Sequence, residues 1–148
     1  MADTVRTAIA DKMKTITGIG QVHEYERYAK DLSGLAEFYG NADGQLRGWF
    51  IRRQSVEEIR DGRPLETVRW QIRGYMALSD ANQSELQFND LVDAIRTAFR
   101  VDCSLGGKVT TTATDDGNGI QMPEFQQVLF ANVLCHAVTL TLTTERYL

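Results

Sequence analysis

The chain has 148 residues and a formal net charge of −4 at pH 7, with 16 Lys and Arg against 20 Asp and Glu. This length is typical of one domain, and 43% hydrophobic residues with only two prolines exclude a disordered or collagen-like chain. The acidic balance argues against nucleic-acid binding through bulk positive charge, and no run approaches the ~18 apolar residues of a membrane helix.

An amphipathic helix of about four turns is predicted at the start of the chain, because apolar residues recur there at steps of three or four. They are Val5, Ile9, Met13 and Ile16. Asp3 or Thr4 can cap the first turn, and Gly18 and Gly20 are expected to end the helix.

The next fifty residues are predicted to form a strand, a helix and a second strand. Residues 21–25 alternate around one apolar side chain, which favours a short strand. Residues 26–39 have helical periodicity that Gly34 interrupts, and a turn at 41–44 leads to a strand over 46–54.

The clearest strand is predicted at 67–78, where apolar and polar side chains alternate. One face carries Val68, Trp70, Ile72, Met76 and Leu78, and the other carries Thr67, Arg69, Gln71, Arg73 and Tyr75. With the strand at 46–54 it should form a hairpin. The segment 56–66 holds Asp61, Gly62 and Pro64, which predicts a long, charged loop between the two strands.

A third helix is predicted from the Ser79–Asn82 region to about Arg100, and Asn82 and Glu85 have the spacing of a capping box. Its apolar stripe is expected to pack on the sheet face that carries Trp70. The stripe consists of Phe88, Leu91, Val92, Ile95 and Phe99.

The last third of the chain is predicted to hold two strands, at 108–114 and 128–144, because β-branched residues and alternation mark them. Residues 115–119 are expected to form a turn. The glycine-rich stretch at about 104–124 buries little, which predicts an extended loop or arm.

These elements predict a single α+β domain over residues 1–148, with a mostly antiparallel sheet and the helices packed on one face. The expected order is α-β-α-β-β-α-β-β. The two cysteines, Cys103 and Cys135, are too few for a disulfide framework, and the first residues lack the apolar core of a secretion signal. We therefore expect a cytosolic protein with reduced thiols.

No residue pattern predicts catalysis, a cofactor or a metal site, so we do not expect an enzyme. Cys135 and His136 are neighbours on a predicted strand and should point to opposite faces, which favours ordinary buried roles over joint chelation. The glycines at 18–20 follow a helix, the reverse of a dinucleotide-binding loop. The acidic pairs at 57–58 and 115–116 are expected in solvated loops, with cation binding as the alternative.

The predicted hairpin carries arginine and aromatic residues of the kind enriched at interface hot spots. The candidate subunit or partner surface consists of Arg47, Trp49, Arg52, Arg53, Arg69, Arg73 and Tyr75. Two alternatives remain open. Trp49 and Trp70 can belong to the core beneath solvated arginines, or the aromatic side chains can stack on nucleic-acid bases, which the acidic total disfavours.

Several segments resemble small proteins encoded among the tail genes of tailed bacteriophages and prophages. They are residues 19–28 (IGQVHEYERY), 48–53 (GWFIRR), 72–80 (IRGYMALSD) and 84–88 (SELQF), with a looser echo at 133–136 (VLCH). The resemblance spans roughly residues 16–100. The chain's size and element order are also similar to the tail terminator and tail-completion proteins of long-tailed phages.

The resemblance implies a structural protein that forms a ring, usually of six subunits, which caps the tail tube and joins it to the head. It implies three partners: further copies of the chain, the tail-tube protein and the head–tail connector. It also implies a place in the virion after synthesis in the bacterial cytoplasm, without a membrane or direct nucleic-acid contact. The alternatives are another connector or minor tail protein, and a monomeric module that binds a host protein.

Overall fold

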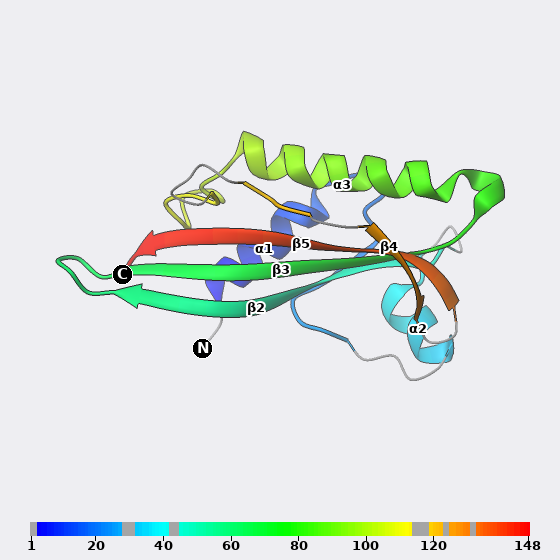
Figure 1. The fold of residues 1–148 in the computed structure, drawn as a ribbon, viewed down its shortest axis with the longest axis horizontal. Coiled ribbons are helices and arrows are strands. Elements are labelled where there is room, and N and C mark those ends of the chain that lie inside the picture. Colours follow the sequence, from blue (N-terminus) through cyan, green and yellow to red (C-terminus); the bar gives the residue numbers. More distant parts are fainter. Residues whose placement is uncertain (1–2, 28–31, 42–44, 114–118, 123–124, 131–132) are drawn as a thin grey trace.

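The computed structural model describes residues 3–27, 32–41, 45–113, 119–122, 125–130 and 133–148. The helices are α1 (Thr4–Lys14), α2 (Leu32–Tyr39) and α3 (Ser84–Val101), with a short 3-10 helix η1 (Asp80–Asn82) before α3. The strands are β1 (Gln21–His23), β2 (Arg47–Ile59), β3 (Leu65–Ala77), β4 (Phe125–Phe130) and β5 (Val133–Tyr147) (Figure 1).

The strands form one sheet in the order β1-β2-β3-β5-β4. The β1–β2 pair is parallel and the other pairs are antiparallel, so the expected α+β class with a mostly antiparallel sheet is confirmed. The strands β2, β3 and β5 are 13, 13 and 15 residues long and run side by side along the molecule (Figure 1).

The predicted long loop of the β2–β3 hairpin is wrong. The strand β2 continues to Ile59, and Val56 pairs with Val68 while Glu58 pairs with Glu66. Backbone pairing with β3 extends the hairpin, and the side chains of this part of β2 stay exposed to water. The charged residues of this segment therefore indicated a strand exposed to water, and they did not indicate a loop.

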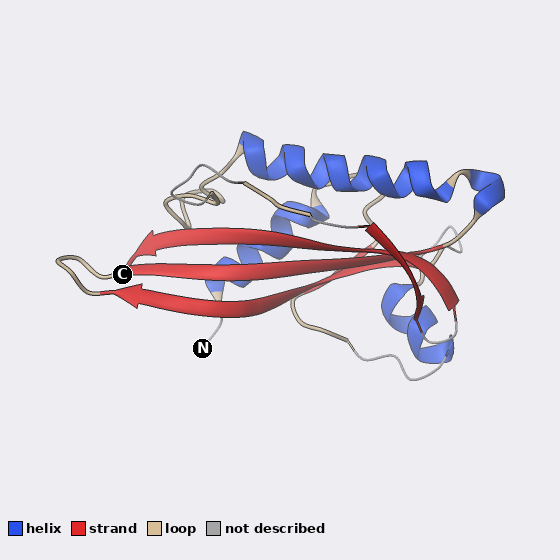
Figure 2. Ribbon diagram, viewed as in Figure 1, coloured by secondary structure: helices blue, strands red, loops and turns tan. Residues whose placement is uncertain are grey.

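The helices cover both faces of the sheet, which corrects the expected packing on one face. We call the face under α1 and α3 the inner face and the opposite one the outer face; Figure 2 shows α3 on one side of the strands and α2 on the other. On the outer face, Tyr39 of α2 forms a small second core with Phe50. The Tyr39 ring lies directly on Gly48, where a Cβ atom would overlap it.

The main core fills the space between the inner face and the helices α1 and α3. From the sheet it contains Trp49, Ile51, Val68, Trp70, Ile72, Met76, Leu140 and Leu142, and from the helices Val5, Ile9, Met13, Phe88, Val92, Ile95 and Phe99. The predicted stripe of the third helix is confirmed, with Leu91 partly buried at its side. The Trp49 ring occupies the space above Gly74, which explains why that strand position has no Cβ atom.

The ends of α1 and α3 differ in part from the prediction. Asp3 caps α1 by accepting a hydrogen bond from the Arg6 backbone N–H at 3.2 Å, as expected, but α1 ends at Lys14, before Gly18. The predicted capping box of α3 is wrong, because Asn82 lies in η1 and the residue before α3 is Gln83, in left-handed conformation.

The predicted strand at 108–114 is absent from the described part of that segment, which makes only an isolated bridge between Thr111 and Glu145. The expected strand at 128–144 is instead two antiparallel strands, β4 and β5, so the last two strands of the predicted order are not those observed. Leu105 and Val109 are buried in the main core, so the described part of 104–124 lies against the chain's own sheet. The glycine-rich composition had suggested that this stretch buries too little to offset the entropy lost when its backbone is ordered. The burial of these two side chains supplies part of that free energy.

Parts of three further predictions fall on residues outside the described ranges. They are the turn at 41–44, the turn at 115–119 with its acidic pair, and residues 28–31 of the second helix.

Candidate functional site

The seven residues of the predicted interface do not form one surface. Trp49 exposes none of its surface, and its indole N–H donates a hydrogen bond to the Ile19 carbonyl at 2.8 Å. Trp70 is also buried and donates to the Thr144 hydroxyl at 2.9 Å. Both tryptophans are core residues, so Trp49 is removed from the predicted surface.

The sheet separates the five arginines onto two faces. Arg52 pairs with Gln71 on the outer face, where Arg69 and Arg73 also lie, because alternate residues of a strand share a face. Arg53 pairs with Trp70 and therefore lies on the inner face, where its guanidinium is 3.8 Å from the Asp3 carboxylate.

Arg47 pairs with Met76, which places it on the inner face too. The outer face thus retains Arg52, Arg69, Arg73 and Tyr75 from the predicted set. Their spacing along the strands could be read from the sequence, and alternation with the buried Trp49 and Ile51 places Arg53 on the inner face. The irregularity between Arg53 and Ser55 changes the alternation only for the residues that follow it.

Tyr75 belongs to an aromatic cluster at the α2 end of the outer face. Its ring stacks on Phe130 at 4.5 Å between centroids, and Tyr39 meets Phe130 edge-on at 5.2 Å. Burial raises the pKa of the Tyr39 phenol. Burial also raises the pKa of the Tyr75 phenol, which the charge of Glu26 raises further and the charge of Arg73 lowers. The packed rings of this cluster cover the outer face of the sheet at the α2 end.

An apolar surface lies where β4 meets the start of α3. We call it the β4 surface, and it consists of Leu78, Leu86, Phe125, Leu129 and Leu134. Leu129 is 73% exposed and pairs across the strands with Leu134, whose carbonyl accepts a hydrogen bond from Leu78 N–H at 3.0 Å. Leu78 and Leu86 also line one hollow of about 380 Å³. Its other lining residues are polar or charged: Asp80, Gln83, Ser84, Glu85, Gln127 and His136.

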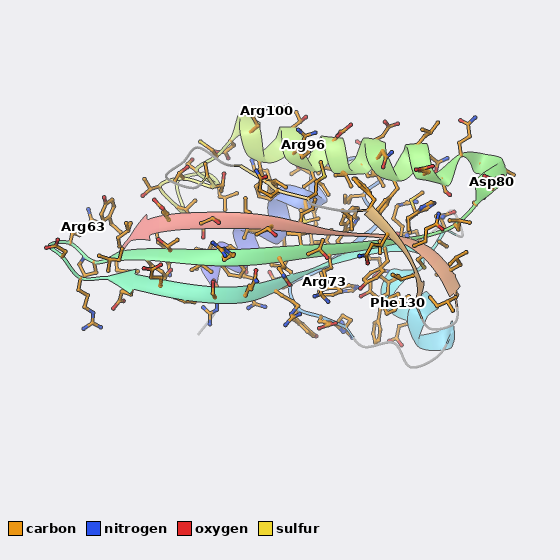
Figure 3. All side chains as sticks on the ribbon, viewed as in Figure 1. Arg63, Arg73, Asp80, Arg96, Arg100 and Phe130 are labelled. Atoms are coloured by element: carbon orange, nitrogen blue, oxygen red, sulfur yellow. The ribbon has the colours of Figure 1, made fainter. Side chains whose placement is uncertain are left out.

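A second apolar surface lies at the far end of the long strands. We call it the tip surface, and it consists of the exposed Ile59, Tyr147 and Leu148 together with the half-buried Leu65. Leu65 pairs with Ile59 on one side and Tyr147 on the other, so the three side chains form a row on the outer face. Arg63 lies 5.3 Å above the Tyr147 ring. Figure 3 places Arg63 at this end and Phe130 and Asp80 at the opposite end.

Sequence reasoning missed both apolar surfaces. Ile59 and Leu65 were assigned to a loop, and their place beside Tyr147 follows only from the register of three strands. Leu129 lay in a predicted strand, but no sequence signal showed that this strand is at the edge of the sheet. The uncharged composition of residues 125–130 becomes informative only once the fold places this segment at the edge of the sheet, where charged residues are usual.

Ser84 and His136 form a buried polar pair between α3 and β5. The Ser84 hydroxyl lies 2.8 Å from His136 Nε2 and accepts a hydrogen bond from Ser79 N–H at 2.9 Å. The Phe88 ring stacks on the imidazole at 5.9 Å. Among the described residues no carboxylate hydrogen-bonds to His136, so the geometry ties the start of α3 to the sheet and does not form a triad.

Cys135 is buried and burial raises the pKa of its thiol to about 11, while Cys103 is exposed. Within the described ranges no three His, Cys, Asp or Glu side chains are close enough to hold a metal ion. Glu57 and Glu58 are strand residues of β2, which corrects their assignment to a loop; Glu58 accepts a hydrogen bond from Arg60 at 2.6 Å. None of the helices described has the length and apolar content to span a membrane.

No protein-family model matches the chain, and no curated protein is significantly similar to it.

Proposed function

We propose that this chain is a structural subunit that assembles into a closed ring of identical copies, with the tip surface of one copy against the β4 surface of the next. The observation that carries the proposal is the presence of two different exposed apolar surfaces at opposite ends of one sheet. Head-to-tail assembly requires two such surfaces on each subunit, and it gives a ring when the rotation between copies closes.

The length of the strands keeps the two surfaces apart. Leu65 and Ala77 are the first and last residues of β3, and 13 residues of strand span about 43 Å. The tip surface lies at the Leu65 end and the β4 surface at the Ala77 end. One neighbour therefore cannot cover both surfaces with a single small contact, and a heterologous arrangement covers each surface with a different neighbour.

The edge strand β4 supports the same proposal. Folded proteins usually protect a free sheet edge with lysine, proline or a short strand, because an exposed apolar edge pairs with other chains. The six residues of β4 include neither charge nor proline, and no described strand pairs with its outer edge. An edge of this composition fits a permanent contact between subunits.

We further propose that the ring is a phage tail terminator that caps the tail tube and joins it to the head. The resemblance over residues 16–100 supports this assignment, together with an α+β fold whose outer sheet face is open at the centre. The proposed partners are the tail-tube protein and the head–tail connector, and the proposed location is the head–tail junction of the virion.

Sedimentation of two surface variants tests the ring. Leu129→Glu places a charge on the β4 surface and Ile59→Glu places one on the tip surface. We expect the parent chain to form a closed species of fixed stoichiometry and each variant to remain a monomer. A mixture of the two variants retains one intact pair of surfaces, so it should form a dimer of one copy of each and nothing larger.

Val101→Glu is the matched control, because Val101 is exposed on α3 outside both surfaces, and it should assemble like the parent. A parent that stays monomeric at every concentration contradicts the ring. Unchanged assembly of Ile59→Glu contradicts the head-to-tail arrangement and assigns the contact to β4 alone.

The terminator assignment has its own test. Rings mixed with tubes assembled from the tail-tube protein of the same phage genome should appear at one tube end in electron micrographs. Rings that bind the connector and not the tube favour the alternative of another connector protein. A monomer that captures no tube favours the host-binding module.

A further inference from the structure

A hollow on the outer face lies over β3 and β5 and reaches the edge strand β4. Its volume is about 430 Å³. The residues that line it are Arg73, Tyr75, Gln126, Val128, Ala137, Val138 and Thr139. The register explains the grouping, because Arg73 pairs with Thr139 and Tyr75 pairs with Ala137, which in turn pairs with Gln126 of β4. Figure 3 shows Arg73 near the middle of the long strands.

The arginine in this hollow has an unused hydrogen-bond donor. Arg73 Nε is buried, and no described residue accepts a hydrogen bond from it. A buried donor without an acceptor costs about 1–3 kcal/mol, and more when the group is charged. Some other described arginines meet a carboxylate, such as Arg60, which reaches Glu58 at 2.6 Å, and Arg146, which reaches Glu66 at 2.8 Å, whereas no described residue forms an ion pair with Arg73. Arg73 is therefore a candidate binding residue for a ligand that carries a hydrogen-bond acceptor.

The other lining groups favour one kind of ligand. Tyr75 and Thr139 bring hydroxyl groups that can donate hydrogen bonds, and Val128 and Ala137 form an apolar wall. Arg73 is the one residue lining the hollow that carries a full charge, which suits a monoanion better than a phosphate dianion. The planar guanidinium matches the two oxygens of a carboxylate, and the apolar wall can contact the methylene groups next to it.

We propose that this hollow binds a carboxylate group, which accepts hydrogen bonds from the Arg73 guanidinium and from the Tyr75 or Thr139 hydroxyl. The carboxylate can come from an acidic side chain of a protein partner or from a small free acid. Neither source requires a ring. A test of carboxylate binding therefore gives a result that does not depend on whether the chain assembles into a ring.

The Arg73 Nε–H signal in a ¹⁵N-correlated NMR spectrum gives a direct readout, and its loss in Arg73→Lys assigns it. The probes are acetate, a blocked Gly-Glu-Gly peptide, the matching Gly-Gln-Gly peptide, inorganic phosphate and sodium chloride at equal ionic strength. We expect saturable shifts with acetate and with the Glu peptide and none with the Gln peptide or chloride. Tighter binding of the Glu peptide assigns a protein-borne acid, and equal binding assigns a free acid.

Arg69→Gln is the matched control, because Arg69 is an exposed arginine on the same strand and the same face. In the variants, binding is followed by the backbone amide signals of Ala137 and Thr139, which line the hollow, because Arg73→Gln has no Nε–H signal. Arg73→Gln should weaken binding at least about tenfold and Arg69→Gln by less than about twofold, since a lost bidentate contact has an effect of this order. The proposal is overturned if acetate and the Glu peptide give only the shifts of chloride, if phosphate binds more tightly than both, or if Arg69→Gln weakens binding as much as Arg73→Gln. Core amide signals check that each variant is folded.

Discussion

The inner and outer faces of the sheet share the same three long strands but bury very different amounts of side chain. On the inner face, Trp49, Trp70 and Ile72 lie beneath α1 and α3 with almost no exposure. On the outer face, Arg52 and Arg69 are exposed to water. Since hydrophobic stabilisation follows the apolar area removed from water, most of the stability should come from the inner face. The outer face is left free to carry recognition groups.

One end of the outer face does not follow this division. There α2 closes over Gly48, and Tyr39, Phe50, Tyr75 and Phe130 form a second, aromatic core. The hollow at Arg73 lies between this core and the open centre of the face. The two faces therefore differ most in side-chain burial at the centre of the sheet and least at the α2 end.

The largest effect should come from Phe88→Ala on the inner face. Phe88 is buried and stacks on Trp49 at 5.6 Å, so truncation should lower the free energy of unfolding by ~3–5 kcal/mol. Urea titration measures the change. Val101→Ala is the control on the same helix, because its side chain is exposed outside both apolar surfaces, and we expect little change. Equal losses in both variants would show that α3 does not supply the core as described.

The next largest effect should come from Ser84→Ala, which leaves His136 without its partner in the space between α3 and β5. Among the described residues, Ser84 is the one hydrogen-bond partner of the His136 side chain, and a buried polar group that loses its partner costs about 1–3 kcal/mol of stability. Ser55→Ala, an exposed serine on β2, is the control and should stay near the parent value. A Ser84→Ala variant as stable as the parent implies that solvent replaces the hydroxyl.

The sequence predicted the inner face well because burial imposes periodicity. Val5, Ile9 and Met13 at helical spacing and Trp70 and Ile72 at strand spacing were all placed correctly. These positions can be predicted locally, because each helix buries one stripe of side chains and each strand buries one face. The alternation of residues 67–78 also correctly predicted that Arg69 lies on the polar face, which is the outer face of the sheet.

The remaining features depend on contacts between distant parts of the chain. Ser84 and His136 are joined only by the fold, and no local pattern connects them. The row of Ile59, Leu65 and Tyr147 requires the register of two strand pairs. For this reason the predicted interface included a buried tryptophan and missed both apolar surfaces.

The aromatic core at the α2 end should respond to alkaline pH. Burial raises the pKa of Tyr39 in the folded chain, whereas the unfolded phenol ionises near pH ~10. Above that pH the unfolded chain gives up a proton that the folded chain retains, so stability is full below about pH 10 and falls as pH rises. The loss is at most about 1.4 kcal/mol per pH unit for this group.

Tyr39→Phe tests this effect, because it removes the ionisable group and keeps the ring. Urea titrations at pH 8 and at about pH 11 should show a smaller loss of stability for Tyr39→Phe than for the parent. Tyr25→Phe, an exposed tyrosine, should lose stability like the parent. An identical alkaline loss in all three chains would assign the effect to other groups, such as Tyr75.

The smallest effect should come from Arg52→Gln at the open centre of the outer face. Arg52 is exposed and pairs with Gln71, while its neighbour Ile51 is fully buried on the inner face. No described residue forms an ion pair with Arg52, so its replacement removes a solvated charge and leaves the strand pairing intact. The free energy of unfolding should change by no more than about 0.5 kcal/mol, the usual range for a surface substitution. A loss of several kcal/mol in the same urea titration would mean that the outer face contributes to stability, and the division between the two faces would then be wrong.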